Sequence, residues 1–206
     1  MDQTFRTGTK IAVLVVFAAS MFPARNIGAQ QQAGRWSNVV RQSTSATCGP
    51  AALATLWTFF FFNPTTEAEA MRLTGTDEAT VTNLKQLLHA SAVKGYQVEG
   101  RNWNMVRLRR HLKTELLPVL VHLSTPTDHF LLVVGYVDGY LLITDPADGN
   151  YSIHETDFAR RWDGNILLVR STGPLNEDLI RKRRRSAEVR LDTLNRANRI
   201  MSLRRF

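Results

Sequence analysis

The sequence predicts an α+β fold, with helices in the first half, one of which carries a candidate nucleophile, and an antiparallel β-hairpin in the second half. Apolar residues recur at helical spacing up to about residue 112, and from Pro118 they form the short runs typical of strands. Cys48, the only cysteine, stands where the first helix is expected to begin. With 206 residues, 44% of them hydrophobic, the chain is long enough for one ordinary domain with appendages.

The helical half is divided by proline and glycine. The Gly49-Pro50 pair predicts a helix start, because proline is tolerated in a first helical turn, and Asn63-Pro64 ends that helix. Gly75 and Gly95 are suitable stops for two further helices. The expected elements are helices at 66–73, 82–93 and 105–112, with a short strand at 96–100 between the last two.

A β-hairpin is the clearest feature of the second half. A short strand at 118–123 comes first, and then two apolar runs, His129 to Tyr136 and Tyr140 to Pro146, flank Asp138-Gly139. The hairpin therefore begins at His129 and ends at Asp145, so both polar groups fall at its open end.

The length of the hairpin loop decides whether these groups can meet. A two-residue loop places Asp145 opposite Leu132, on the other face of the sheet from His129. A three-residue loop, Val137-Asp138-Gly139, places Asp145 opposite Leu131, as a diagonal neighbour of His129 at roughly 7–8 Å between backbones. We predict the longer loop.

Cys48 is the candidate nucleophile. The unpaired N–H groups and the dipole at a helix N-terminus favour an anion there, which activates a thiol. Gln42 lies six residues upstream, far enough for the chain to turn back towards the sulfur, and we expect its amide, with the Cys48 N–H, to stabilise an oxyanion. The competing interpretation is a small buried cysteine in a core helix.

Together these residues predict nucleophilic catalysis. Cys48 would attack a carbonyl carbon, His129 would take and return its proton, and Asp145 would orient the imidazole. Asp128 is a weaker orienting candidate, because adjacent strand residues point to opposite faces. His122, His154 and Asp148 are lower-ranked candidates. The alternative interpretation is that His129 and Asp145 only mark the ends of a hydrophobic strand pair.

The two ends of the chain fall outside the expected domain at 30–171. Residues 1–29 combine Arg6 and Lys10 with an apolar run at 11–22, which predicts a signal peptide or, alternatively, an uncleaved anchor. We therefore expect an exported protein, periplasmic or extracellular, or one that residues 11–22 hold at the membrane. An exported chain with one cysteine cannot form an internal disulfide, so the thiol must be buried or used.

The net charge of +8 is concentrated in the tail. Residues 172–206 hold ten Lys or Arg against four carboxylates, whereas the middle of the chain is neutral, which argues against nucleic-acid binding. The tail is expected to be a solvated extension, partly helical or disordered, or alternatively a docking element for anionic lipid headgroups or an acidic partner. No metal-ligand cluster or phosphate-binding loop appears in the sequence, so we expect no cofactor.

The order of these motifs resembles the C39 peptidases, the double-glycine peptidases of bacteriocin processing. The resemblance extends over about residues 37–170 and rests on Gln42, Cys48-Gly49-Pro50-Ala51, His129-Phe130 and Asp145-Pro146, followed by Phe158, Trp162, Gly164 and 167–169. It implies a papain-like α+β fold, in which the N-terminal helix that carries the nucleophile packs on an antiparallel β-sheet. It also implies Cys48 as nucleophile, His129 as base, Asp145 as its orienter and Gln42 as oxyanion donor. Thr47 departs from the family, where an acidic residue is common at this position.

The resemblance implies an exported cysteine peptidase that cleaves a secreted substrate, after a Gly-Gly-type leader. Many family members are domains of export transporters, but nothing after Arg170 predicts membrane spans or an ATP site, so a free-standing form with a possible secretion-system partner is expected. The alternative is a peptide-binding module of the same fold that assists secretion or maturation without cutting. A thiol-dependent transferase is a lesser variant.

Overall fold

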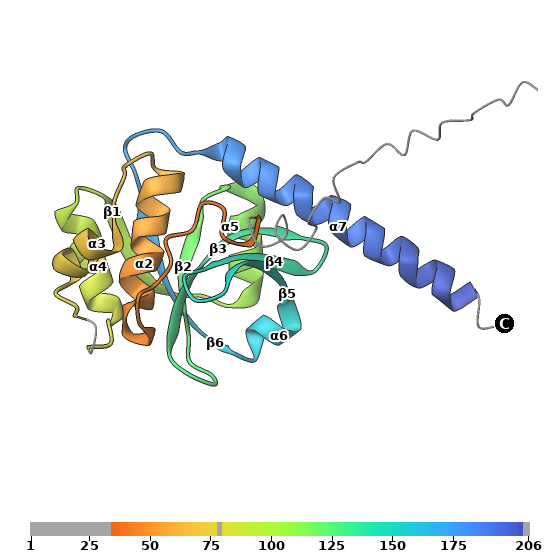
Figure 1. The fold of residues 1–206 in the computed structure, drawn as a ribbon, viewed down its shortest axis with the longest axis horizontal. Helices are drawn as coiled ribbons and strands as arrows, with labels where there is room; N and C mark the ends of the chain where they lie inside the picture. Colours follow the sequence, from red (N-terminus) through yellow and green to blue (C-terminus); the bar gives the residue numbers. More distant parts are fainter. Residues whose placement is uncertain (1–33, 78–79, 204–206) are drawn as a thin grey trace, which may run out of the picture.

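The computed structural model describes residues 34–77 and 80–203 as a six-stranded antiparallel sheet with helices packed around it (Figure 1). The predicted signal segment, 1–29, lies outside the described residues. The strands, in the order β1-β6-β2-β3-β4-β5 across the sheet, are β1 Gln97–Asn102, β6 Trp162–Arg170, β2 Val119–Leu123, β3 His129–Val137, β4 Tyr140–Asp145 and β5 Gly149–His154. The α+β class predicted from the sequence is therefore confirmed.

Most helices precede the sheet in sequence. A 3-10 turn, η1 Ser45–Thr47, leads into α2 Cys48–Thr55, which continues as the π-helical η2 Leu56–Phe60. The remaining helices are α3 Glu67–Thr74, α4 Leu84–Val93, α5 Met105–Thr114, α6 Glu155–Ala159 and α7 Glu177–Leu203.

The core lies between α2 and the central strands. Every residue of α2 is buried, and Leu53, Leu56 and Trp57 are fully enclosed. The helix contacts β3 on one side and α3 and α4 on others. A helix that is apolar on all sides is expected to be buried in this way. In Figure 1, α2, α3 and α4 stand together on one side of the sheet, and α7 runs along its top and projects beyond it.

The β3–β4 hairpin corrects the predicted loop. Val137 pairs with Tyr140, so the loop is the two-residue Asp138-Gly139, both at positive φ as a tight hairpin turn requires. The prediction of a three-residue loop is therefore wrong. A β-bulge at Val134 instead supplies the extra residue, because Gly135 pairs with Leu142 and Val133 with Ile143.

The bulge has the consequence for register that was expected from the longer loop. Beyond it Leu132 pairs with Thr144, so Asp145 comes opposite Leu131 and shares a face of the sheet with His129.

Among the helices of the described residues, none is long and apolar enough to cross a bilayer.

Candidate active site

Cys48 is the first residue of α2. The preceding turn is held by a capping box, in which Thr44 and Thr47 exchange side-chain and backbone hydrogen bonds, and the Thr47 hydroxyl also donates to the Thr44 carbonyl at 3.1 Å. Thr47 is fully buried and Cys48 is 1% exposed, so this turn fixes the thiol at the start of the helix.

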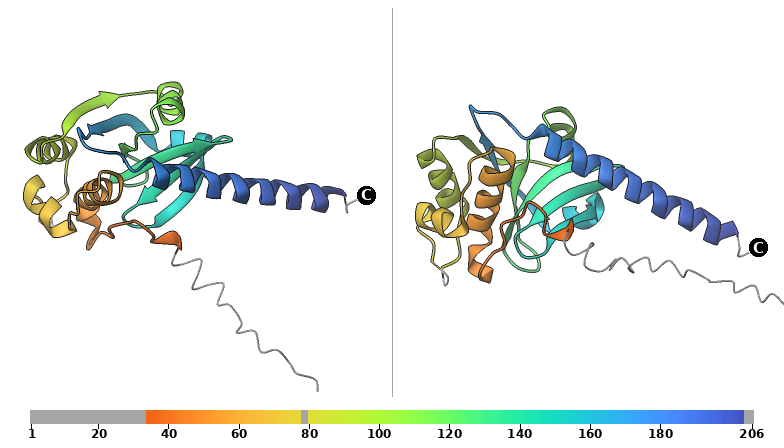
Figure 2. Two further views of the ribbon diagram at one scale, coloured as in Figure 1. Left: turned by 90° about the horizontal axis from the view of Figure 1, so that it is seen from above. Right: turned by 45° about the horizontal axis from the view of Figure 1, so that its top comes forward.

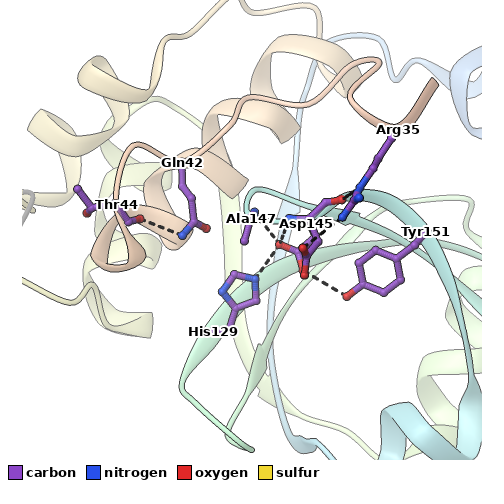
Figure 3. A network of polar contacts seen from close by, with 8 residues as sticks. Arg35, Gln42, Thr44, His129, Asp145, Ala147 and Tyr151 are labelled. Carbon is purple, nitrogen blue, oxygen red and sulfur yellow. Dashed lines mark hydrogen bonds and ion pairs between the residues drawn. The ribbon is translucent and has the colours of Figure 1, made fainter. Parts of the chain in front are cut away.

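His129 and Asp145 meet at the open end of the hairpin. His129 Nε2 donates to Asp145 Oδ1 at 2.8 Å, and the Asp145 side chain is almost fully buried (Figure 3). The side chain of Cys48 lies close enough to His129 to raise the pKa of the imidazole. Because Nε2 is used by Asp145, Nδ1 is the ring nitrogen that remains for the thiol. The structure thus brings together the three residues that the sequence singled out.

These contacts control the protonation of His129. Burial alone would lower the pKa of His129, but the hydrogen bond to Asp145, the charge of Asp145 and the nearby Cys48 side chain raise it to about 9. The site therefore favours a protonated imidazole beside the Asp145 carboxylate at neutral pH.

Asp145 is fixed by four donors. Its Oδ1 also accepts the backbone N–H groups of Ala147 at 2.8 Å and Asp148 at 3.3 Å, and Tyr151 donates its hydroxyl to Oδ2 at 3.2 Å (Figure 3). Burial would raise the pKa of Asp145, whereas the bonds from His129 and the two backbone groups lower it. Burial and the Asp145 charge raise the pKa of Tyr151, which keeps the phenol protonated as a donor.

Tyr151 was not singled out from the sequence. It lies on β5, which pairs with β4 so that Asp145 faces Gly149, and this register makes Tyr151 a diagonal neighbour of Asp145 on the same face. The signal that could have found it is the alternation of residues 149–154 directly after the Asp145-Pro146 turn.

Gln42 lies close to the same turn, since its backbone N–H donates to the Pro146 carbonyl at 3.1 Å. Its side-chain Nε2 donates to the Thr44 carbonyl at 2.9 Å, and its buried Oε1 has no partner among the described residues (Figure 3). Because the Thr44 carbonyl accepts a hydrogen bond, the side-chain nitrogen of Gln42 must point towards it. The amide nitrogen of Gln42 has two N–H groups, and the second remains for another acceptor.

The segment before Gln42 holds the turn that supports Asp145. Asn150 Nδ2 donates to the Ser37 carbonyl at 2.8 Å, and Arg35 binds both the backbone carbonyl and the carboxylate of Asp148. Gly149 has φ +76°, and a Cβ there would lie 2.5 Å from the Arg35 carbonyl oxygen. Only glycine permits this close approach of the two segments.

A cleft of about 340 Å³ opens beside Cys48. Val81, Leu84 and Phe130 form its apolar walls, and His122, Asp128 and Asp163 contribute polar groups. His122 Nδ1 bonds Asp163 at 2.7 Å, and this contact lowers the pKa of Asp163 although burial would raise it. The nucleophile candidate therefore borders a hollow large enough for part of a peptide.

The weaker sequence candidates lie outside the Cys48–His129–Asp145 arrangement. Asp128 is 3.3 Å from His122, and His154 bonds Thr156. Asp148 contributes its backbone N–H to Asp145 rather than its carboxylate. The described residues contain no group of three or more side chains suited to a metal ion.

The antiparallel sheet, the helix that begins at Cys48 and the site between them define a papain-like α+β protein. The profile of the peptidase C39 family matches residues 36–173, and the chain belongs to this family.

Among curated proteins, the chain is 32% identical over 131 residues to an uncharacterized protein of Methanothermobacter thermautotrophicus, spanning 64% of this chain and 87% of that protein. It is 22% identical over 150 residues to the probable functional amyloid protease FapD of Pseudomonas aeruginosa, spanning 68% of this chain but 63% of that protein.

Two solved structures share the fold. The peptidase domain of Streptococcus ComA, a bifunctional ABC transporter of a quorum-sensing pathway, matches with a TM-score of 0.56 and 21% identity over 66% of this chain and 97% of that domain. A double-glycine-motif protease from an AMS/PCAT transporter, in complex with its leader peptide, matches with a TM-score of 0.57 and 23% identity over 66% of this chain and 90% of that protease. The predicted resemblance to the C39 peptidases is thus confirmed.

Proposed function

We propose that this chain is an exported cysteine peptidase that hydrolyses a peptide bond of a protein substrate. The observation that supports this most directly is that His129 hydrogen-bonds the buried Asp145 and lies close enough to Cys48, at the start of α2, for the two side chains to interact. A buried structural cysteine would need neither a histidine partner nor a carboxylate oriented behind it.

The proposed reaction follows the geometry. Cys48 Sγ, after its proton has passed to His129, attacks the scissile carbonyl carbon. The second Nε2 hydrogen of Gln42, with the Cys48 backbone N–H, stabilises the oxyanion. His129 gives its proton to the leaving amine, which departs and leaves a thioester. A water then attacks the thioester while His129 takes its proton, and the return of that proton to sulfur releases the acid product.

The substrate part of the proposal is a leader peptide ending in a Gly-Gly-type motif. Its support is membership of the C39 family and the likeness to a double-glycine-motif protease bound to a leader peptide. Export is supported by the sequence pattern of residues 1–29, and sequencing the N-terminus of the protein purified from the periplasm or medium tests it.

Cleavage of a fluorogenic peptide carrying a Gly-Gly motif tests the activity. We expect the full chain to cleave after the second glycine, and both Cys48→Ala and His129→Ala to lower kcat/KM by about a thousandfold or more. His154→Ala, which removes a surface histidine bonded to Thr156, is the matched control and should keep the activity.

Labelling separates a peptidase from a binding module of the same fold. A thiol-reactive peptide analogue should modify Cys48 faster in the native protein than in His129→Ala. Peptide binding without cleavage, together with equally slow labelling of both proteins, would refute the peptidase and favour the module.

A further inference from the structure

A second hollow lies away from Cys48. It is a groove of about 920 Å³ between α7, strands β4 and β5, and the segment 34–38. Leu142 and Tyr151 contribute from the sheet, and Lys182, Arg183 and Arg190 from α7. Figure 2 shows α7 running over these strands before it projects away from the sheet.

The groove is lined by four cationic residues and no carboxylate. Arg35, the fourth cation, pairs with Asp148, whereas the ion pairs made by the described part of α7 are Arg181–Glu177 and Arg196–Asp192. Within the described residues, Lys182, Arg183 and Arg190 therefore have no carboxylate partner. Three uncompensated positive charges converge on one hollow.

Arg183 is the most confined of them. Its guanidinium donates to the Thr144 hydroxyl and to the Ile143 carbonyl, the latter at 3.0 Å, and both acceptors are neutral. Burial, together with the positive charge of nearby Arg190, lowers the pKa of Arg183 to about 10. A confined cation without a counterion is costly, and an anionic group entering the groove would offset that cost.

The shape of the site favours a peptide as the source of that group. The groove is a hollow between a helix and a sheet, which the flat surface of a bilayer cannot fill. Its lining includes Asn150, Tyr151 and Ser152 of β5, which is the last strand of the described sheet and has no strand beyond it. An extended chain can align with such an edge while its carboxylates meet the cations of α7.

We infer that the groove between α7 and the β4–β5 edge binds an acidic segment of a protein partner. Because α7 begins after residue 173, where the match to the C39 family ends, the α7 cations of this site lie outside the matched region. The proposal does not involve Cys48 or His129, so it can be tested whether or not the chain is a peptidase.

Fluorescence anisotropy of a labelled peptide tests the site. The probe is a short peptide of alternating Glu and Thr, and the control peptide carries Gln in place of Glu. The full chain should bind the Glu peptide and not the Gln peptide. Charge reversal in the double variant Lys182→Glu and Arg190→Glu should weaken binding by about tenfold or more.

The matched control is the double variant Arg185→Glu and Arg196→Glu, which changes the net charge equally at exposed positions of α7 outside the groove. It should change binding by less than about twofold, because exposed charges that do not contact the ligand are screened. Equal weakening by both variants would show general attraction to the tail and overturn the site. The same follows if the Glu and Gln peptides bind alike, or if phosphatidylglycerol vesicles bind the chain and the Glu peptide does not.

Discussion

The protonation of one residue, His129, governs the proposed chemistry. Its raised pKa means that the imidazole already carries a proton at neutral pH, held between Asp145 and Cys48. In that state His129 acts first as the acid that protonates the leaving amine, and the carboxylate of Asp145 stabilises the charge throughout. Loss of the His129 proton is expected to end activity on the alkaline side.

Activity should therefore fall as the pH rises through about 9, the pKa of His129. Asp145→Asn removes the negative charge that favours the imidazolium, so the pKa of His129 should fall and the alkaline limb should move to lower pH. The measurement is kcat/KM against pH for both proteins. An alkaline limb that stays in place in Asp145→Asn would contradict this account of the His129–Asp145 pair.

Tyr151 should influence the reaction through Asp145. Tyr151→Phe removes the hydroxyl that donates to Oδ2 and keeps the ring, so we expect kcat to fall about threefold to tenfold with little change in the cleft beside Cys48. Steady-state kinetics measure this, and an unchanged KM would place the effect on the reaction rather than on binding. Tyr140→Phe is the control, because the hydroxyl of Tyr140 makes no hydrogen bond among the described residues while its ring packs on His154. Equal losses in both variants would argue against a role of Tyr151 through Asp145.

At the level of elements, the hairpin explains what the sequence could and could not predict. The Asp138-Gly139 turn and the two apolar runs located both strands, and the polar groups at their open end pointed to His129 and Asp145. The bulge at Val134 was missed. Gly135, an isolated glycine inside a strand, is a signal for a bulge, but it does not fix the residue at which the extra position falls. The prediction that His129 and Asp145 share a face of the sheet was therefore correct, although the three-residue loop on which it was based was wrong.

The support around Asp145 was harder to predict because it comes from distant segments. Tyr151 depends on the register of β5, and the turn after Asp145 depends on contacts with residues 34–42, more than a hundred positions upstream. Such pairings follow from tertiary packing and have no local periodicity.

Gly149→Ala should test how much this upstream segment matters. The new Cβ would meet the Arg35 carbonyl and force the segment off the turn whose N–H groups hold Asp145. We expect the free energy of unfolding to fall by about 2–4 kcal/mol, part from the positive φ and part from the collision, and kcat to fall with it. Urea unfolding and steady-state kinetics provide the two measurements.

Gly75→Ala separates the two causes. Gly75 also has a positive φ, +65°, but a Cβ there would have no neighbour within 4 Å. This variant should lose only about 1 kcal/mol of stability and keep its kcat. If Gly149→Ala is no worse than Gly75→Ala, the contact with Arg35 does not support Asp145.

In the whole molecule, α7 joins the two elements that carry the site. At its start, Asn176 donates its side-chain amide to the Phe59 carbonyl and its backbone N–H to the Phe60 carbonyl, both at 2.8 Å, at the end of the helix that begins with Cys48. Further along, Ile180 is fully buried and Arg183 holds Ile143 and Thr144, directly before Asp145. The α7 helix therefore connects the helix that begins with Cys48 to β4, which carries Asp145, although α7 lies beyond the residues that match the family.

Two truncations should divide α7 into a structural half and a free half. Ending the chain after Gly173 removes the buried Ile180 and the bonds of Arg183, so the free energy of unfolding should fall by at least about 3 kcal/mol and kcat should fall as Asp145 loses support from β4. Ending it after Asp192 removes residues from the projecting half, where Leu194 is exposed, and should leave both quantities unchanged. Thermal unfolding and peptide cleavage measure the two effects. If the shorter chain were as stable and as active as the longer one, α7 would be an appendage that contributes nothing to the site.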